Sequence, residues 1–200
     1  MDGVISDTQK LHSKVEAEIF RSYGVHISPE EITEKYSGVK DTEFFGNLLP
    51  DKDINIEEVI ERKWVEMNSL VKEGVDSIEG VIELIEFLSE KEYKMAVGSA
   101  SNLNYVNAVL KELNIIKFFD SVTSSEEVKY GKPNPETFLL AAKRINIHPE
   151  ECVVIEDGIS GMIAANRAKM LSVGLVDTKD KKKYPAKILV KKLSEIRDIL

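Results

Sequence analysis

Over the first third of the chain, apolar residues recur at the spacing of a helix that buries one face. Leu11, Val15 and Ile19 are four residues apart, and residues 55–73 carry a similar apolar stripe. No convincing strand pattern interrupts this region. The hydrophobic pattern therefore predicts that residues 8–74 fold as one helix after another.

Near residue 76 the pattern changes, and short apolar runs begin to alternate with amphipathic segments. The expected strands are 94–97, 120–123, 152–155, 171–176 and, as a further candidate, 186–190. The expected helices are 81–88, 105–113, 135–145 and 159–168. Strands that alternate with helices are typical of βαβ units, so this part of the sequence predicts an α/β fold with a parallel sheet.

Four short clusters of small and polar residues accompany this alternation. They are residues 2–7 at the start of the chain, 98–102 after the strand 94–97, 131–135 ahead of a helix, and 156–161 after the strand 152–155. Parallel strands place their carboxyl ends at one edge of the sheet, and sites form there. We therefore expect the four clusters to meet at that edge.

The residue types in these clusters suit phosphoryl transfer, for which a protein supplies position and a positive field. The Ser99 hydroxyl and the amides beside it can hold phosphate oxygens at a helix start. Lys132 offers a point charge for the same oxygens. Glu156 and Asp157 are oxygen ligands of the kind that Mg²⁺ prefers, and Asp2 could move a proton on and off a leaving oxygen.

Each cluster also has a purely structural explanation when it is taken alone. Ser-Ala-Ser after a strand is usually a helix start, a lysine before a proline is usually a solvated loop residue, and Glu-Asp-Gly is often only a turn. The order of all four clusters along the chain, at expected strand ends, is what favours the chemical interpretation.

This order resembles that of the haloacid dehalogenase-like hydrolases, in the branch related to β-phosphoglucomutase and phosphoglycolate phosphatase. Asp2-Gly3-Val4 matches the end of the family's Asp-x-Asp-Gly motif, and Ser99 matches the second motif. Lys132 matches the third motif, and Glu156-Asp157 with its Gly-x-x-Gly continuation matches the fourth. The resemblance covers essentially the whole chain.

The resemblance implies a parallel Rossmann-like sheet core with an inserted all-helical cap domain. Residues 1–7 and 76–200 would form the core, and residues 8–75 the cap. In the cap, His12 and Lys40 match positions that contact substrate in β-phosphoglucomutase-like enzymes. A helix-surface histidine and a solvated lysine are the alternative explanations for these two residues.

The resemblance also assigns roles to the motif residues. Asp2 would be the general acid and base, and Mg²⁺ would be bound by the backbone carbonyl of Asp2 and, directly or through water, by the carboxylates of Glu156 and Asp157. Lys132 would stabilise the nucleophile and the transferring group, and Ser99 would hold a phosphate oxygen. The residues expected to contact substrate are His12, Lys40, Ser99, Ala100, Ser101 and Asn102.

One element of the family pattern is not in this sequence. The family's nucleophile is the first Asp of Asp-x-Asp, which would lie just before Met1, as would the strand that leads to it. That strand would lie between the strands carrying Ser99 and Asp157, so we expect a gap there. Three explanations stay open: a start several residues upstream, a truncated chain, or a protein that binds without turnover.

We therefore expect an Mg²⁺-dependent phosphatase that hydrolyses a small phosphomonoester, of the sugar phosphate or phosphoglycolate class, through an aspartyl-phosphate. One alternative is a phosphotransferase of the β-phosphoglucomutase type, in which a sugar hydroxyl replaces water as the acceptor. The other alternative is a catalytically inactive binding module.

The charge of the chain narrows the range of partners. A net charge of -8 argues against a nucleic acid or an anionic membrane, whereas a few local cations are enough for a small phosphorylated metabolite. No apolar run approaches the roughly 20 residues of a membrane span. The single cysteine and the lack of a secretory pattern at the N-terminus favour the cytoplasm, and we expect a monomer.

Overall fold

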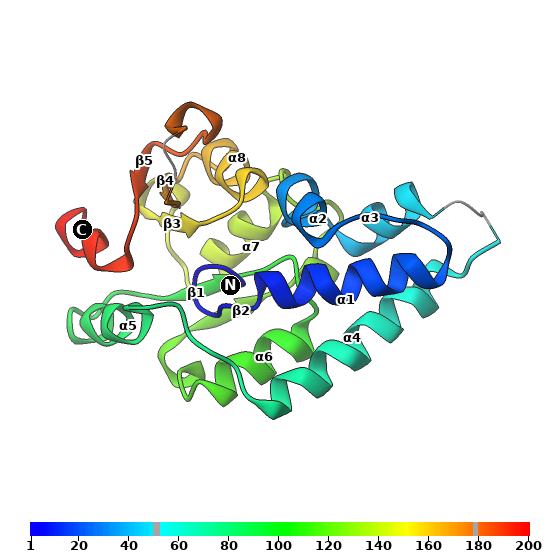
Figure 1. The fold of residues 1–200 in the computed structure, drawn as a ribbon. Coiled ribbons are helices and arrows are strands. Elements are labelled where there is room, and N and C mark those ends of the chain that lie inside the picture. The colour runs from blue at the N-terminus through cyan, green and yellow to red at the C-terminus, as the bar shows by residue number, and fades with distance from the viewer. Residues whose placement is uncertain (50–52, 178–179) are drawn as a thin grey trace.

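The molecule has two parts, and the helices of one lie beside the mixed strands and helices of the other (Figure 1). The computed structural model describes residues 1–49, 53–177 and 180–200. The first part is built from α1–α4 and the second from α5–α8 with β1–β5. Their order follows the alternation that the hydrophobic pattern predicts.

Among its described residues, the first part contains helices and no strand, as expected. Its helices are α1 (Gln9–Ser22), α2 (Pro29–Tyr36), α3 (Asp41–Leu48) and α4 (Ile56–Glu73). Ser28 caps α2 by accepting a hydrogen bond from the Glu31 backbone N–H at 3.1 Å, and Pro29 follows at the first helical position. The apolar faces of α1 and α4 pack together, α1 also packs on α2, and α4 also contacts α6 of the other part.

The second part alternates strands with helices. Its elements are α5 (Val81–Glu90), β1 (Ala96–Gly98), α6 (Leu103–Glu112), β2 (Ser121–Thr123), α7 (Glu136–Arg144), β3 (Val153–Glu156), α8 (Ile159–Arg167), β4 (Leu171–Leu175) and β5 (Ile188–Val190). Short 3₁₀ segments join them: η1 (Ile116–Phe118), η2 (Ser125–Glu127), η3 (Pro149–Glu151), η4 (Lys181–Lys183) and η5 (Leu193–Asp198). All five expected strands are present. No helix in the described ranges is long and apolar enough to cross a membrane.

Every strand pair in the described residues is parallel, which confirms the predicted fold class. The strands form two separate sheets, β1–β2 and β3–β4–β5. Helix α7 packs on β1 and β2, while α8 packs on β3 and β4. The helices thus cover the sheets in the manner of βαβ units.

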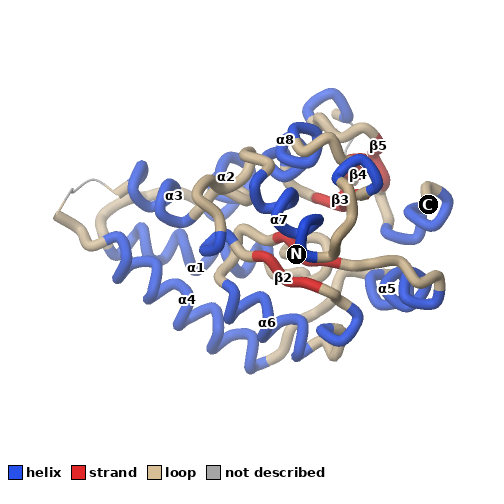
Figure 2. The backbone as a smooth tube through the Cα atoms, turned by 180° about the vertical axis from the view of Figure 1, so that it is seen from behind, coloured by secondary structure: helices blue, strands red, loops and turns tan. Residues whose placement is uncertain are grey.

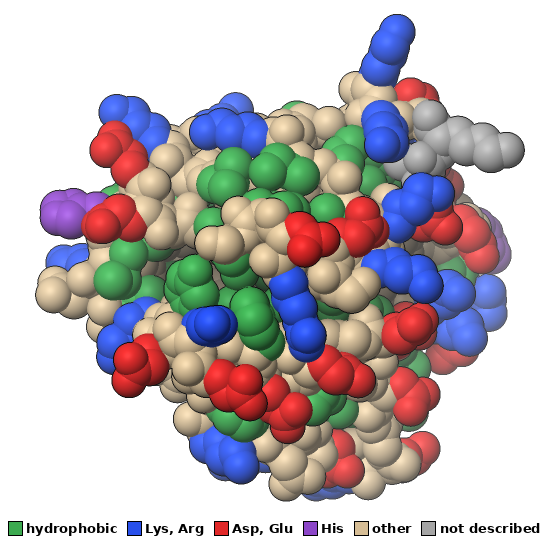
Figure 3. All heavy atoms as spheres, turned by 90° about the vertical axis from the view of Figure 1, so that its left-hand side faces the viewer, with side chains coloured by type: hydrophobic (Ala, Val, Ile, Leu, Met, Phe, Trp, Pro, Cys, Tyr) green, Lys and Arg blue, Asp and Glu red, His purple; other side chains and the backbone are tan. Residues whose placement is uncertain are grey.

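A gap separates the two sheets where a central strand was expected. Between β1 and β3 lies a mostly apolar cavity of about 470 Å³, whose lining includes Val97 of β1 and Val153 and Ile155 of β3. The cavity continues to α5 and η5. Figure 3 shows the face of the molecule that lies on the left in Figure 1, the side of α5, and hydrophobic side chains gather in the middle of this face. The edge strands on either side of this space have unpaired backbone groups, and the side chains around it are mostly apolar. One more parallel strand could fit there.

The N-terminal residues lie next to this gap. Met1, Val4 and Ile5 contribute to its lining, and the views from both sides place the N-terminus near the middle of the molecule (Figures 1 and 2). A tight turn follows, in which the Gly3 N–H donates to the Ser6 carbonyl at 2.8 Å. This turn delivers Asp2 to the carboxyl ends of β1 and β3.

Candidate active site

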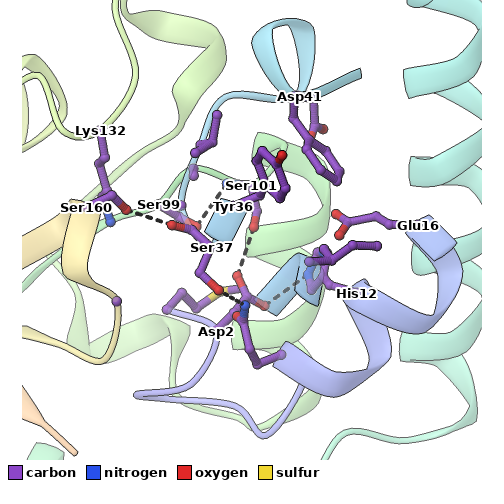
Figure 4. A pocket seen from close by; sticks show the side chains of 18 of the residues that line it. Asp2, His12, Glu16, Tyr36, Ser37, Asp41, Ser99, Ser101, Lys132 and Ser160 are labelled. Atoms are coloured by element: carbon purple, nitrogen blue, oxygen red, sulfur yellow. Dashed lines mark hydrogen bonds and ion pairs between the residues drawn. The ribbon is translucent and has the colours of Figure 1, made fainter. Parts of the chain in front are cut away.

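Side chains from both parts of the molecule line one cavity of about 80 Å³ at the carboxyl ends of β1 and β3. Figure 4 shows His12 and Glu16 of α1 on one side of this cavity and Lys132 on the other. The residues that the second part and the N-terminal turn contribute are Met1, Asp2, Ser99, Ala100, Ser101, Lys132, Glu156, Asp157, Gly158 and Ser160. The four sequence clusters therefore meet at the edge of the sheets where they were expected.

Asp2 is held in place by four neighbouring side chains. Its Oδ1 accepts hydrogen bonds from the Thr8 hydroxyl at 2.5 Å and from the Tyr105 hydroxyl at 3.3 Å. Its Oδ2 accepts a hydrogen bond from the Ser101 hydroxyl at 2.8 Å, and His12 Nε2 lies 3.2 Å from Oδ1. The carboxylate therefore has a fixed orientation at the floor of the cavity.

These contacts keep Asp2 ionised. Burial raises the pKa of Asp2, but the charge and hydrogen bond of His12, the charge of the N-terminal ammonium and the hydrogen bond from Thr8 outweigh burial and hold the pKa well below its usual range. Burial, and then the charge of Asp2, raise the pKa of Tyr105, so its hydroxyl stays a donor. A carboxylate with so low a pKa is a weak base, so Asp2 can exchange a proton with a substrate only when some of these donors are displaced.

Ser99 begins the loop that joins β1 to α6. Its backbone N–H donates to the Thr123 carbonyl at 2.9 Å and continues the β1–β2 pairing by one residue. Its buried hydroxyl accepts a hydrogen bond from the Ser101 N–H at 3.1 Å. The loop thereby turns the Ser99 and Ser101 hydroxyls toward the cavity, beside a helix start that favours anions.

Lys132 and Glu156 form a buried ion pair beneath the cavity. The Lys132 ammonium contacts the Glu156 carboxylate, donates to the Gly98 carbonyl at 3.3 Å and lies 4.7 Å from the centre of the Phe138 ring. Burial raises the pKa of Glu156, but the charge of Lys132 more than offsets burial and keeps the pKa below its usual value. The pair connects the end of β1 to the end of β3 across the gap.

Asp157 forms no ion pair among the described residues, although the charges of the N-terminal ammonium and of Lys132 act to lower its pKa. Burial, and then the charge of the neighbouring Glu156, raise the pKa of Asp157 to about 7. The carboxylates of Glu156 and Asp157 are adjacent, and the ammonium of Lys132 balances only one of them. The negative charge that remains at this point of the cavity would be stabilised by a divalent cation.

The donor set at this point suits a hard cation such as Mg²⁺. In the described ranges, no three His, Cys, Asp or Glu side chains lie together in a way that could hold a metal ion by themselves. The carboxylate of Glu156 is engaged by Lys132, and that of Asp2 by its hydroxyl donors and His12. Among the described residues, Asp157 is therefore the one of these carboxylates that no side chain engages, with Glu156 adjacent to it, and its role as a metal ligand stays a prediction.

Changing Gly3 should disturb Asp157 specifically. Gly3 has a φ of +74°, and a Cβ at this position would lie 2.1 Å from Asp157 Oδ2. We expect Gly3→Ala to displace the Asp157 carboxylate and weaken Mg²⁺ binding by roughly 10- to 100-fold, the range found when metal-site supports are removed. Calorimetric titration with Mg²⁺ measures this.

Gly46→Ala is the matched control, because Gly46 lies in α3 and its added Cβ would meet no atom within 4 Å. A folded Gly3→Ala variant that binds Mg²⁺ as tightly as the unchanged protein would rule out Asp157 as a ligand.

His12 lies where the sequence placed a substrate-contacting residue. It is buried on α1, with its ring edge-on to Trp64 and Tyr105 at centroid distances of 5.7 and 5.1 Å. Its contact with Asp2 gives it a second role, which is to orient that carboxylate. Ala100 and Ser101 also line the cavity, as expected.

Lys40 and Asn102 are directed elsewhere. The Lys40 ammonium donates to the Val128 carbonyl at 3.0 Å, outside the cavity lining. Asn102 caps α6 by accepting from the N–H groups of residues 104 and 105, and its amide donates to Glu126 at 2.7 Å. The structure therefore does not bring these two predicted residues to the cavity, because each side chain is engaged by nearby polar groups.

Three charged residues of the helical part line the cavity although the motifs did not indicate them. They are Glu16 on α1, Asp41 at the start of α3 and Lys63 on α4. One signal was present in the sequence: Glu16 lies four residues after His12 and so shares its helix face. The meeting of the three residues depends on the packing of α1, α3 and α4, which no local pattern encodes.

Comparison with known proteins agrees with this geometry. Residues 1–175 match the family described as haloacid dehalogenase-like hydrolase. The chain is 31% identical over 178 residues to hexitol phosphatase B of Escherichia coli K12, covering 86% of this chain and 79% of that protein. It is 32% identical over 170 residues to the phosphorylated carbohydrates phosphatase of Thermotoga maritima, covering 84% and 78%.

A solved structure shares the whole fold. The β-phosphoglucomutase of Clostridium difficile is similar with a TM-score of 0.86 and 29% identity, covering 98% of this chain and 92% of that one. Together with the family match, this similarity identifies the enzyme class: the chain belongs to the haloacid dehalogenase-like hydrolases, in the branch of sugar-phosphate phosphatases and β-phosphoglucomutases.

Proposed function

We propose that this protein is an Mg²⁺-dependent phosphatase for a small phosphomonoester of the sugar or polyol phosphate class. The observation that carries the proposal is the convergence of Asp2, Ser99, Lys132 and Asp157 on one cavity at the ends of two parallel strands. These are the groups needed to hold a phosphoryl group, neutralise its charge and move a proton. The names of two relatives, a hexitol phosphatase and a phosphorylated carbohydrates phosphatase, support the same class of substrate.

In this proposal each residue has one task. The hydroxyl of Ser99 and the amides that follow it hold phosphoryl oxygens, and Lys132 supplies positive charge from below. Asp157, with Glu156 beside it, would hold Mg²⁺, which supplies charge to a phosphoryl group when it is bound. Once a substrate has replaced its present donors, Asp2 would carry a proton to the leaving oxygen in the first step, and would take one back from the water that attacks in the second step.

The nucleophile in this proposal is an Asp carried just ahead of Met1, by a strand that fills the gap between β1 and β3. The apolar lining of that gap, its volume of about 470 Å³ and the position of Met1 in its wall support this idea. The carboxylate would emerge at the same edge as Ser99 and Asp157. Attack by this Asp would form an aspartyl-phosphate, which water then hydrolyses.

The helices α1–α4 act as a cap in this proposal, with residues 8–75 as the cap and residues 1–7 and 76–200 as the core. The cavity of about 80 Å³ is far smaller than the roughly 300–1,000 Å³ of most ligand pockets. A sugar phosphate would therefore need the cap to separate from the core before it can enter. Closure would then exclude bulk water from the reaction.

Phosphate release tests the proposal. The assay uses a sugar and polyol phosphate panel, with Mg²⁺ and with EDTA, on the 200-residue chain beside a chain extended upstream to include the Asp before Met1 (below, the extended chain). We expect Mg²⁺-dependent release from the extended chain only. Conversion of β-glucose 1-phosphate to glucose 6-phosphate without phosphate release would favour the mutase instead. Binding without turnover in both chains would overturn the phosphatase and favour a binding module.

A further inference from the structure

At the cap end of the cavity, one ammonium group is held between two carboxylates. Lys63 Nζ lies 2.7 Å from Glu16 Oε1 and 2.6 Å from Asp41 Oδ1. The exposed fractions of the three side chains are 4%, 10% and 13%, so this cluster is almost fully removed from solvent. All three residues line the same cavity as Asp2, Ser99 and Lys132.

The charge of this cluster is opposite to what a phosphate site needs. Two carboxylates and one ammonium leave a net negative charge, in a low-dielectric setting where repulsion of a second anion is strong. Burial lowers the pKa of Lys63, but the charges of Asp41 and Glu16 raise it well above its usual value. The Lys63 ammonium is thus fully charged and already paired with two carboxylates. It also lies 4.4 Å from the centre of the Trp64 ring.

The hydrogen-bonding capacity of the cluster points to hydroxyl groups. Lys63 contacts one oxygen of each carboxylate, and the second oxygens of Glu16 and Asp41 can accept from O–H donors. Trp64 and Tyr36 line the same cavity, so aromatic rings lie in its wall beside these carboxylates. A surface of acceptors beside aromatic rings matches a neutral chain or ring of hydroxylated carbons.

We propose that Glu16, Asp41 and Lys63 determine specificity by binding the hydroxyls of a neutral sugar or polyol leaving group and by rejecting a second phosphate or a carboxylate there. This inference rests on the proposed phosphatase function, and deepens it by fixing the charge of the leaving group. It separates alternatives that the motifs left open. Phosphoglycolate carries a carboxylate, and a mutase needs a bisphosphate intermediate with an anion at each end of the cavity.

Three substrates test the proposal in the extended chain: sorbitol 6-phosphate, fructose 1,6-bisphosphate and 2-phosphoglycolate. We expect kcat/KM to be at least about tenfold higher for the sorbitol ester than for the two others, the scale of discrimination that one pocket interaction supplies. This comparison uses the unchanged protein and does not depend on how any variant folds.

Charge-removing variants then test the residues. Glu16→Gln and Asp41→Asn are made separately. In each variant one carboxylate still pairs with Lys63, and the net charge of the cluster changes from negative to neutral. We expect the ratio of kcat/KM for fructose 1,6-bisphosphate to that for sorbitol 6-phosphate to rise about tenfold in each variant, and further in the double variant. Glu18→Gln is the matched control, because Glu18 lies on α1 but is exposed.

The outcomes distinguish the two proposals. If the extended chain hydrolyses all three substrates equally and the variants leave the ratio unchanged, the specificity assignment is wrong while the phosphatase stands. If the extended chain hydrolyses neither these three substrates nor any ester of the sugar and polyol phosphate panel, the proposed function fails, and the specificity assignment falls with it.

Discussion

Replacing Lys132 with methionine is expected to destabilise the folded chain by about 3–5 kcal/mol, the cost of removing one partner from a buried ion pair. Lys132 and Glu156 are 4% and 9% exposed, and the ammonium also donates to the Gly98 carbonyl. Methionine keeps most of the apolar stem and removes the ammonium, together with the contact that the ammonium makes with the Phe138 ring. What remains in the variant is a buried carboxylate without its cation.

Urea unfolding of the 200-residue chain in the presence of EDTA measures this loss without requiring catalysis. Lys94→Met is the control, because Lys94 pairs with Asp120 at the surface with 57% of its side chain exposed, and such pairs contribute about 1 kcal/mol or less. The double variant Lys132→Met/Glu156→Gln should recover part of the stability, since it removes the uncompensated charge. If Lys132→Met and Lys94→Met unfold with the same free energy, the buried Lys132–Glu156 pair does not stabilise the fold more than a surface pair does.

Most of the fold could be predicted from the sequence because its signals are local. The apolar stripes of α1 and α4 and the alternation after residue 76 require only neighbouring residues to be read. Even the gap between β1 and β3 followed from the motif that begins at residue 2, because a missing central strand leaves its two neighbours unpaired. Element ends differ by a few residues, as for β1, which begins at Ala96 where residue 94 was expected.

The core side of the site could be predicted for a related reason. Ser99, Lys132 and Asp157 follow strands or precede a helix, so the topology of a parallel sheet fixes where they meet. The cap side could not be predicted, because its geometry comes from contacts between helices that are distant in sequence. Lys40 turns to the Val128 carbonyl, whereas the neighbouring Asp41 reaches the cavity and pairs with Lys63.

The two ends of the cavity therefore have different physical characters. At the core end, the Ser99 loop supplies hydrogen-bond donors and Lys132 supplies an ammonium, and a divalent cation on the carboxylates there would make this end suit a phosphoryl group. At the cap end, Glu16 and Asp41 outnumber the single ammonium of Lys63, which suits hydroxyls. Asp2 lies between them, with contacts to Ser101 from the core and to His12 from the cap.

That position makes Asp2 the residue whose replacement should affect turnover most. Asp2→Asn in the extended chain is expected to lower kcat for phosphate release by about 10²–10⁴-fold, the usual contribution of a positioned acid or base, with a much smaller change in KM. Asparagine keeps the shape, and its one side-chain oxygen can still accept from Thr8, but its amide nitrogen takes the place of the oxygen that accepts from Ser101, and the amide cannot take a proton at neutral pH. Steady-state kinetics on sorbitol 6-phosphate with saturating Mg²⁺ measures both constants, and thermal unfolding verifies that the variant is folded.

Asp76→Asn, an exposed change in the segment that pairs with residue 7, serves as the control. A folded Asp2→Asn variant with unchanged kcat would mean that the Asp2 carboxylate only stabilises the N-terminal turn through its hydrogen bonds. Another group would then transfer the proton.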